Sequence, residues 1–222
     1  MKGLLSLTAV AAFASMSFAQ SWMLKAPYEA EQVTAWNVTI NTVIEGKERV
    51  ARIKQVLTID SKTDKGIKAR AAWTNILIDS ADQSPSDTQW DVSLNLDGSI
   101  ASAGQSGDYG RMMTAGAFVY PNKEVKAFDT WTSKVRPGRG AKEMTLKYTV
   151  LDFTKVGGEE AVKVRGKLSE TDGMTGDLLF WVARDGRVLK FDLDLTGWVI
   201  PFATESHRID AKVKGELVKQ VE

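Results

Sequence analysis

The chain holds few residues that could act as a catalytic nucleophile or base. His207 is its only histidine, and it contains no cysteine. Ser106 lies in the run Gly-Gln-Ser-Gly-Asp, where Asp108 replaces the last glycine of a G-x-S-x-G nucleophile motif, and no helical pattern follows. Because a triad also needs a base and an orienting acid beside the nucleophile, we predict no hydrolase site. His207 is predicted to be a surface residue at a strand edge.

The carboxylates and the candidate metal ligands also favour a protein without catalysis. Aspartate and glutamate fall mostly on the polar face of predicted strands or in turns, where they serve solubility and turn geometry. The segment 79–87 and the pair Asp172-Gly173 do not reproduce a calcium-loop spacing. One histidine without cysteine disfavours a transition-metal site. We therefore predict no cofactor and no enzyme, with a glycosidase-like pair of carboxylates as the third-ranked alternative.

The charges indicate no polyanionic partner. Lys2 is the only charged residue among the first 20, and the rest of the chain has as many acidic as basic residues. No nucleic-acid partner is predicted from this balance. The densest basic cluster is Arg136–Gly140 with Lys134 and Lys142 beside it. We interpret it as a solvated hairpin loop, with a contact to an anion or phospholipid headgroup as the alternative.

The N-terminus has the pattern of a signal peptide, predicted over residues 1–19. Lys2 provides a positive start, residues 4–14 form an uncharged apolar run, and Ser17-Phe18-Ala19 offers small residues at a cleavage site. The run is shorter than the roughly 20 residues that cross a bilayer, and no later run approaches that length. We expect an exported chain, periplasmic or extracellular, without a membrane span after cleavage and without a cysteine-linked lipid anchor.

Alternation of apolar and polar residues dominates the remainder. Trp36, Val38 and Ile40, for example, alternate with Asn37 and Thr39. A period of two between polar turns is typical of antiparallel strands with one buried face. We expect a mainly β fold: a curved antiparallel sheet or half-barrel of about ten strands with few or short helices, or alternatively a two-sheet sandwich. The glycine-rich segment 104–116 is predicted to be a loop with at most one helical turn.

Two stretches of the chain resemble each other in order. Trp36 and Trp131 each begin a strand, Asp60 and Asp152 each end the next, and Asp-Gly turns follow at residues 97–98 and 185–186. We predict one domain over residues 20–222, built of two similar halves, 31–103 and 131–222, joined by a connector, 104–130. Two unrelated meanders with similar hydropathy are the alternative. The Asp97-Gly98 turn is predicted to be of type I′, and the Asp185-Gly186 turn is predicted to form a second hairpin.

The connector carries a further pattern. Pro121, the run Lys123-Glu124-Val125-Lys126, and Asp129-Thr130-Trp131 resemble a signature of exported bacterial β proteins, Pro…Val-Lys-x-Gly-Asp-x-Trp, with Phe128 at the glycine position. Such proteins are similar in shape to the half-barrels of lipoprotein carriers (the LolA and LolB type), which bind acyl chains. This resemblance implies an exported half-barrel and assigns no functional residue.

Aromatic and methionine side chains are the candidate ligand contacts. Trp36, Trp73, Trp90 and Trp181 are predicted on the apolar face of their strands, where core packing alone also accounts for them. Met112, Met113 and Tyr120 lie outside the strand pattern and could cover the open side of the sheet. We predict a non-catalytic protein that binds a lipid or other apolar or amphiphilic small molecule in the concave face of the sheet. The alternative is a structural or protein-interaction module of the cell envelope without such a ligand.

Overall fold

The computed structural model describes residues 21–222 except 84–87, 105, 172, 203–204 and 219–222. The predicted signal peptide lies outside the described residues. Strands make up 68% of the structure, and one short helix accompanies them. The strands are β1 (Trp22–Leu24), β2 (Val33–Ile44), β3 (Lys47–Thr63), β4 (Gly66–Ile78), β5 (Ala81–Asp82), β6 (Thr88–Leu94), β7 (Ile100–Ala103), β8 (Lys123–Val125), β9 (Thr130–Val135), β10 (Met144–Val156), β11 (Glu159–Glu170), β12 (Thr175–Ala183), β13 (Val188–Phe202) and β14 (Glu205–Leu217), and the helix is α1 (Gly107–Gly116).

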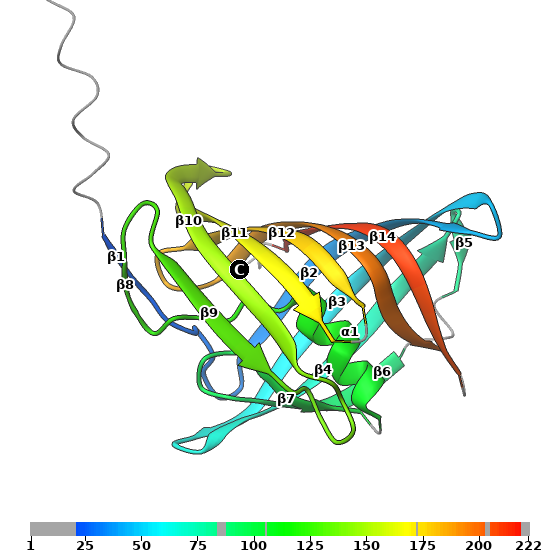
Figure 1. The fold of residues 1–222 in the computed structure, drawn as a ribbon, viewed down its shortest axis with the longest axis horizontal. Helices are drawn as coiled ribbons and strands as arrows, with labels where there is room; N and C mark the ends of the chain where they lie inside the picture. The colour runs from blue at the N-terminus through cyan, green and yellow to red at the C-terminus, as the bar shows by residue number, and fades with distance from the viewer. Residues whose placement is uncertain (1–20, 84–87, 105, 172, 203–204, 219–222) are drawn as a thin grey trace, which may run out of the picture.

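One antiparallel sheet forms most of the molecule. Its order is β7-β6-β4-β3-β2-β14-β13-β12-β11-β10-β9, with β5 paired to β4, while β1 and β8 form a separate ribbon. Figure 1 shows the sheet curving around α1, which contacts β7 at one edge and β13 near the middle. The predicted curved antiparallel sheet is confirmed, with 11–12 strands in a nearly closed arrangement. The two-sheet sandwich is not formed.

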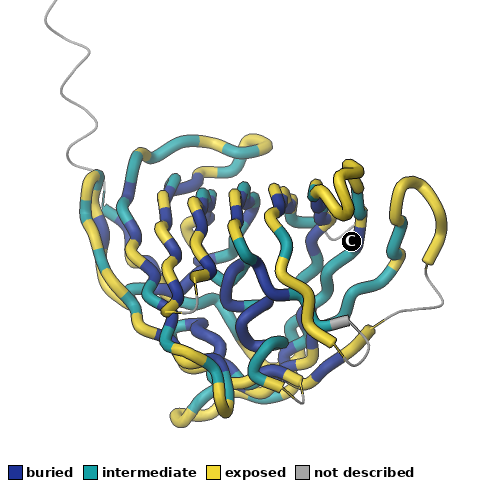
Figure 2. Tube along the Cα trace, turned by 45° about the vertical axis from the view of Figure 1, so that its right-hand side comes forward, coloured by how far each residue is buried: buried dark blue, intermediate teal, exposed yellow. Residues whose placement is uncertain are grey.

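Strand alternation positions the core. Along β14, for example, Ala211 and Val213 are buried while Lys212 and Lys214 are exposed. Figure 2 shows the same change from buried to exposed along neighbouring strands. Because successive side chains of a strand point to opposite faces, the buried apolar residues of the long strands line the concave side of the curved sheet. The core therefore lies between the sheet and the segment that contains α1.

The helix α1 is longer than the sequence predicts. Residues 104–116 were expected to form a loop with at most one turn, whereas Gly107–Gly116 is helical. Gly110 explains why the sequence signal for a helix is weak and why the helix can approach the loop after β9 so closely. Glycine lowers helix propensity, yet a Cβ on Gly110 would lie 1.8 Å from the carbonyl oxygen of Pro137. Tertiary packing against the loop after β9 thus requires the glycines that hide the helix in the sequence.

The first Asp-Gly turn joins β6 to β7. The N–H of Asn95 donates to the carbonyl of Ser99 at 2.9 Å, and the N–H of Gly98 donates to the carbonyl of Asn95 at 2.9 Å. The Asp97 carboxylate accepts from the N–H of Ser99 at 2.9 Å. Only Gly98 has a positive φ, 80°. The predicted type I′ turn, which needs two such residues, is therefore corrected to a longer loop with one left-handed glycine.

The second Asp-Gly turn, between β12 and β13, repeats these bonds. Ala183 N–H donates to Arg187 O at 2.8 Å, and Gly186 N–H donates to Ala183 O at 2.9 Å. Asp185 accepts from the N–H of Arg187 at 3.0 Å, and Gly186 has a φ of 96°. The two turns therefore have one hydrogen-bond pattern, and neither is of type I′.

The first strand of each half also starts in the same way. Glu31 (φ 66°) donates its N–H to Ile59 O at 2.8 Å, and Phe128 (φ 71°) donates its N–H to Val150 O at 2.9 Å. The next residue, Gln32 in one case and Asp129 in the other, accepts the N–H of the same partner residue. This left-handed position explains the glycine of the exported-protein signature, because glycine adopts positive φ without steric cost.

The registers of the two meanders follow from these starts. Val33 pairs with Thr58 and Thr130 pairs with Thr149, so the residues of β3 from Ile53 onward have equivalents in β10. This register corrects two details of the predicted repeat. Trp131 lies at the position equivalent to Thr34 and not to Trp36, and Asp152 lies at the position equivalent to Ser61 and not to Asp60. Duplication of the halves stays a prediction, which the matched turns and strand starts support.

Candidate functional site

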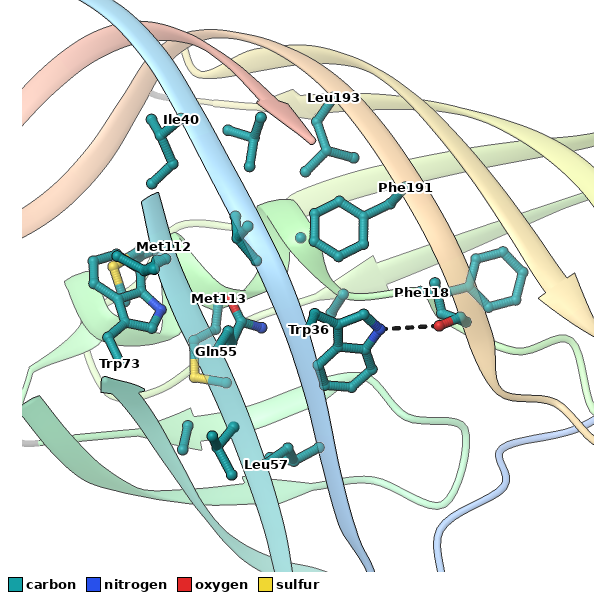
Figure 3. A pocket seen from close by; sticks show the side chains of 18 of the residues that line it. Trp36, Ile40, Gln55, Leu57, Trp73, Met112, Met113, Phe118, Phe191 and Leu193 are labelled. Carbon is teal, nitrogen blue, oxygen red and sulfur yellow. Dashed lines mark hydrogen bonds between the residues drawn. The ribbon is translucent and has the colours of Figure 1, made fainter. Parts of the chain in front are cut away.

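An apolar cavity lies between α1 and the concave face of the sheet. Its volume is about 90 Å³, and its walls come from β2, β3, β4, β6, β13 and β14 on the side of the sheet and from α1 and the residues after it on the other. Figure 3 shows the side chains that face one another across it. Tyr28 is the only ionisable side chain among the described residues that line the cavity. Burial raises the pKa of the Tyr28 hydroxyl to about 12, so this group is neutral at ordinary pH.

The sheet wall contains an amide between two indoles. Gln55 of β3 pairs with Trp36 of β2 on one side and with Trp73 of β4 on the other. All three side chains line the cavity. Trp36 is buried and donates its indole N–H to Val188 O at 2.9 Å, whereas Gln55 and Trp73 are half-buried. Cross-strand neighbours on one face lie in contact, so these residues form a continuous row, hereafter the Trp-Gln-Trp row.

The helix wall is formed by two consecutive methionines. Met113 accepts the indole N–H of Trp90 on its sulfur at 2.9 Å, and Met112 O accepts the indole N–H of Trp198 at 3.2 Å. Trp90 also meets Trp73 edge to face, with ring centroids 5.7 Å apart. Methionine side chains are unbranched and adapt to irregular apolar surfaces. This wall is therefore the more deformable of the two.

An ion-pair network fixes α1 to the sheet. Arg111 makes two hydrogen bonds of 2.6 Å to the Glu170 carboxylate, which is fully buried at the end of β11. It also donates to Asp108 at 2.9 Å, and Asp108 accepts from Ser206 Oγ of β14 at 2.6 Å. The Ser206 hydrogen bond, together with Arg111, lowers the pKa of the Asp108 carboxyl. The Glu170 hydrogen bonds raise the pKa of Arg111, which stays charged.

The concave face over the second half is filled instead of hollow. Phe118 meets Tyr148 and Phe180 with ring centroids 5.3 and 5.2 Å away, and Tyr148 stacks on Trp131 at 4.9 Å. Tyr148 and Phe180 are 1% and 0% exposed. The segment after α1 therefore plugs this part of the sheet with aromatic rings.

Five of the seven predicted ligand contacts come together in the cavity. They are Trp36, Trp73, Trp90, Met112 and Met113. Their role in binding a ligand remains a prediction.

Tyr120 and Trp181 lie elsewhere. Tyr120 is buried. Its hydroxyl donates to Gly186 O at 2.6 Å and its backbone N–H donates to Asp97 O at 2.8 Å, so this residue joins the two Asp-Gly turns. Trp181 lies on the other face of β12, where the ammonium groups of Lys163 and Lys190 are each 5.3 Å from its ring centroid. The prediction that Trp181 lies on the core face of β12 was wrong, because Phe180 and its alternate neighbours face the core.

Sequence reasoning missed several lining residues. Tyr28 lies in the lead-in before β2, and Trp198 follows a bulge in β13 that shifts the alternation. Gln55 had a readable signal, because it is a polar residue in the apolar phase of β3 between Ile53 and Leu57. Arg111 and Glu170 were missed together with the helix.

Metal and membrane features are absent from the part of the chain described above. No three of its histidine, aspartate or glutamate side chains are grouped so that they could hold a metal ion. None of its helices has the length and apolar character needed to cross a membrane.

Comparison with known proteins gives distant structural matches. Neither a protein-family model nor a curated protein sequence matches the chain. The structure is similar to a presumed exported protein with a YmcC-like fold from Bacteroides fragilis, at 13% identity and a TM-score of 0.37 over 89% of this chain and 100% of that chain. It is also similar to a presumed outer membrane lipoprotein-sorting protein domain from Vibrio parahaemolyticus, at 8% identity and a TM-score of 0.23 over 87% and 86%. These matches agree with the weak resemblance noted from the sequence.

Proposed function

We propose that the protein is a non-catalytic, exported binding protein that takes up an apolar or amphiphilic small molecule between α1 and strands β2, β3 and β4. The observation that carries the proposal is the unequal filling of one concave face. Aromatic rings plug the concave face over β9, β10 and β12, while the face over β2, β3 and β4 and the adjoining β13 and β14 keeps a cavity whose walls include tryptophan and methionine. Apolar walls with few polar groups are typical of small-molecule sites.

The ligand must enlarge the cavity. Its volume of about 90 Å³ is below the roughly 300–1,000 Å³ of typical ligand pockets. Met112 and Met113 provide the means, because their side chains can take other rotamers without breaking a backbone hydrogen bond of α1. While these side chains move, the Arg111–Glu170 ion pair keeps the helix backbone in place. We therefore expect side-chain movement at the helix wall and little change in the sheet.

Export is part of the same proposal. The predicted signal peptide supports a periplasmic or extracellular protein that reaches its ligand outside the cytoplasm. The described residues that line the cavity include no aspartate, glutamate, histidine, lysine or arginine, which supports binding without catalysis.

The test is native mass spectrometry of the protein purified from an exporting bacterial host, followed by organic extraction. We expect an adduct with the mass of a lipid or similar amphiphile. Ala117→Phe, which fills the cavity from the segment after α1, is expected to abolish the adduct. Ala81→Phe, at an exposed position of β5, is the matched control and should retain it. A bare protein mass that persists after incubation with lipids would contradict the proposal.

A second function is favoured by one observation. Val43, Ile44 and Ile78 are large apolar side chains that are 60%, 47% and 42% exposed at one end of β2 and β4. Together with the small cavity, this exposure supports a protein-interaction module whose concave face is only its core. The same mass measurement separates the two, since the module would carry no adduct.

A further inference from the structure

Among the described side chains of β2, β3 and β4 that line the cavity, only Gln55 and Trp73 of the Trp-Gln-Trp row carry polar groups without a partner. The indole N–H groups of Trp36, Trp90 and Trp198 each have an acceptor. The Gln55 amide and the Trp73 indole N–H have no hydrogen-bond partner within the described part of the chain. Because no buried side-chain nitrogen or oxygen of that part lacks a partner, these two groups must face accessible space.

The fold does not require an amide at position 55. In the second half, the equivalent of Gln55 is Leu146, which pairs with Ser133 and Leu168 just as Gln55 pairs with Trp36 and Trp73. Leu146 is fully buried and packs without difficulty. The glutamine therefore gives up apolar packing that the same sheet position supports elsewhere, and a binding role accounts for it.

The chemistry of the row selects one type of polar group. Gln55 can donate two N–H bonds and Trp73 one, whereas the carboxamide oxygen of Gln55 is the only acceptor of the pair. A ligand that offers an acceptor therefore satisfies more of these groups than one that offers a donor. No cationic side chain of the described chain lines the cavity, so an ionised carboxylate or phosphate would be buried without compensation.

We propose that the ligand is an uncharged, elongated apolar molecule with a carbonyl acceptor, such as a carboxylic ester, and that Gln55 and Trp73 donate hydrogen bonds to this carbonyl. The inference rests on the proposed function and adds the class of ligand. Gln55 is then the residue that distinguishes esters from hydrocarbons, and the absence of a cation distinguishes esters from ionised fatty acids.

The test uses quenching of tryptophan fluorescence in the full chain by three brominated probes of similar length. They are methyl dibromostearate, dibromostearate at about pH 8, where its carboxyl is ionised, and a dibromoalkane. The variants are Gln55→Leu and, as the matched control, Gln89→Leu, which changes an exposed glutamine of β6. Loss of neutral hydrogen bonds to one carbonyl is expected to reduce affinity by roughly tenfold.

We expect the wild type and the control Gln89→Leu to bind the probes with affinities that fall in the order ester, alkane, ionised acid. In the wild type and in Gln89→Leu, the ester should bind about tenfold more tightly than the alkane. In Gln55→Leu this preference should vanish, while the alkane binds as well as before.

Two results would overturn the inference and leave the proposed function standing. One is an ester preference that survives in Gln55→Leu, and the other is an ionised acid that binds as tightly as its ester. Failure of all three probes to bind the wild type would overturn the proposed function together with the inference. The alkane thus separates the two failures, because its binding needs the cavity but not the amide.

Discussion

Two equivalent rows of the sheet show how one architecture gives a filled and a hollow region. In the first half Gln55 lies between Trp36 and Trp73, and in the second half Leu146 takes the same ladder position beside Leu168. Leu146 and Leu168 are 0% and 3% exposed, whereas Gln55 and Trp73 are half-buried. The two rows occupy equivalent positions of the sheet, so their side chains decide which region is filled and which borders a cavity.

The filled region owes its density to a neighbouring row. Tyr148 pairs with Trp131 on one side and with Gly166 on the other, and the glycine leaves room for its ring. At the equivalent row of the first half, Leu57 and Thr34 are smaller than Tyr148 and Trp131, and Ala71 takes the place of Gly166. Aromatic rings bury more area than these residues, which explains why the second half closes over Phe118 and the first does not.

The largest expected change in the free energy of unfolding comes from placing the central residue of each row, Gln55 or Leu146, in the other row. Leu146→Gln buries an amide without a partner and is expected to lower the free energy of unfolding by about 4 kcal/mol. Gln55→Leu should leave it unchanged or raise it by about 1 kcal/mol, since apolar area replaces an unpaired amide. Urea unfolding measures both. Equal losses in the two variants would contradict the difference between the halves.

The next effect concerns the helix that lies over both regions. Glu170→Gln leaves Arg111 buried with a weaker partner and is expected to cost about 3 kcal/mol in urea unfolding. Glu29→Gln is the control, because the Glu29 carboxylate is 75% exposed in its pair with Lys62 and should change stability by less than about 1 kcal/mol. Similar effects of the two substitutions would show that α1 is not fixed by its ion pair.

Added methyl groups give a smaller and more local comparison. A Cβ on Gly166 would lie 3.1 Å from Leu178 and Tyr148, so Gly166→Ala is expected to destabilise the filled region by about 1–3 kcal/mol. A Cβ on Gly116 would meet only Leu193, at 4.0 Å, beside the cavity. Gly116→Ala should therefore stabilise the chain by about 0.5–1 kcal/mol. Thermal unfolding of both variants checks the opposite signs, and a shared sign would contradict the account.

The smallest effect is a pH dependence of the free energy of unfolding that arises from Asp108 in the first turn of α1. The folded pKa of Asp108 is below its ordinary 3.8, so its carboxylate stabilises the fold above about pH 4, and this contribution disappears as the pH falls through the folded pKa. Because the side chain is 32% exposed, we expect less than about 1 kcal/mol. The difference in unfolding free energy between the wild type and Asp108→Asn should vanish in acid. A difference that is independent of pH would contradict this assignment.

Strands and the positions of the Asp-Gly turns were largely readable from the sequence, because strict alternation leaves one choice of buried face, whereas the type of the first turn was not. The exception is β12, where Leu178–Ala183 is apolar on both faces, so Trp181 was assigned to the wrong side. Helix α1 was not predicted because glycines lower its helix propensity. Gly110 is needed there because the helix packs closely against Pro137, which is distant in the sequence. Local pattern cannot report contacts of that kind.

The candidate site was readable in part for the same reasons. Trp36, Trp73 and Trp90 follow the alternation of their strands, and the two methionines were noted because they interrupt the pattern. Whether such residues enclose a cavity depends on how far other segments fill the concave face, which no single strand determines. Gln55 could have been found as the polar residue in an apolar phase.

The most direct test of a ligand site in the first half is a crystal structure of the protein with methyl dibromostearate, with bromine located by its anomalous scattering. We predict bromine between Trp36, Trp73 and α1, with Met112 and Met113 in new rotamers and the cavity enlarged. Bromine bound only on the outer surface, or a cavity that stays empty at about 90 Å³, would contradict the account.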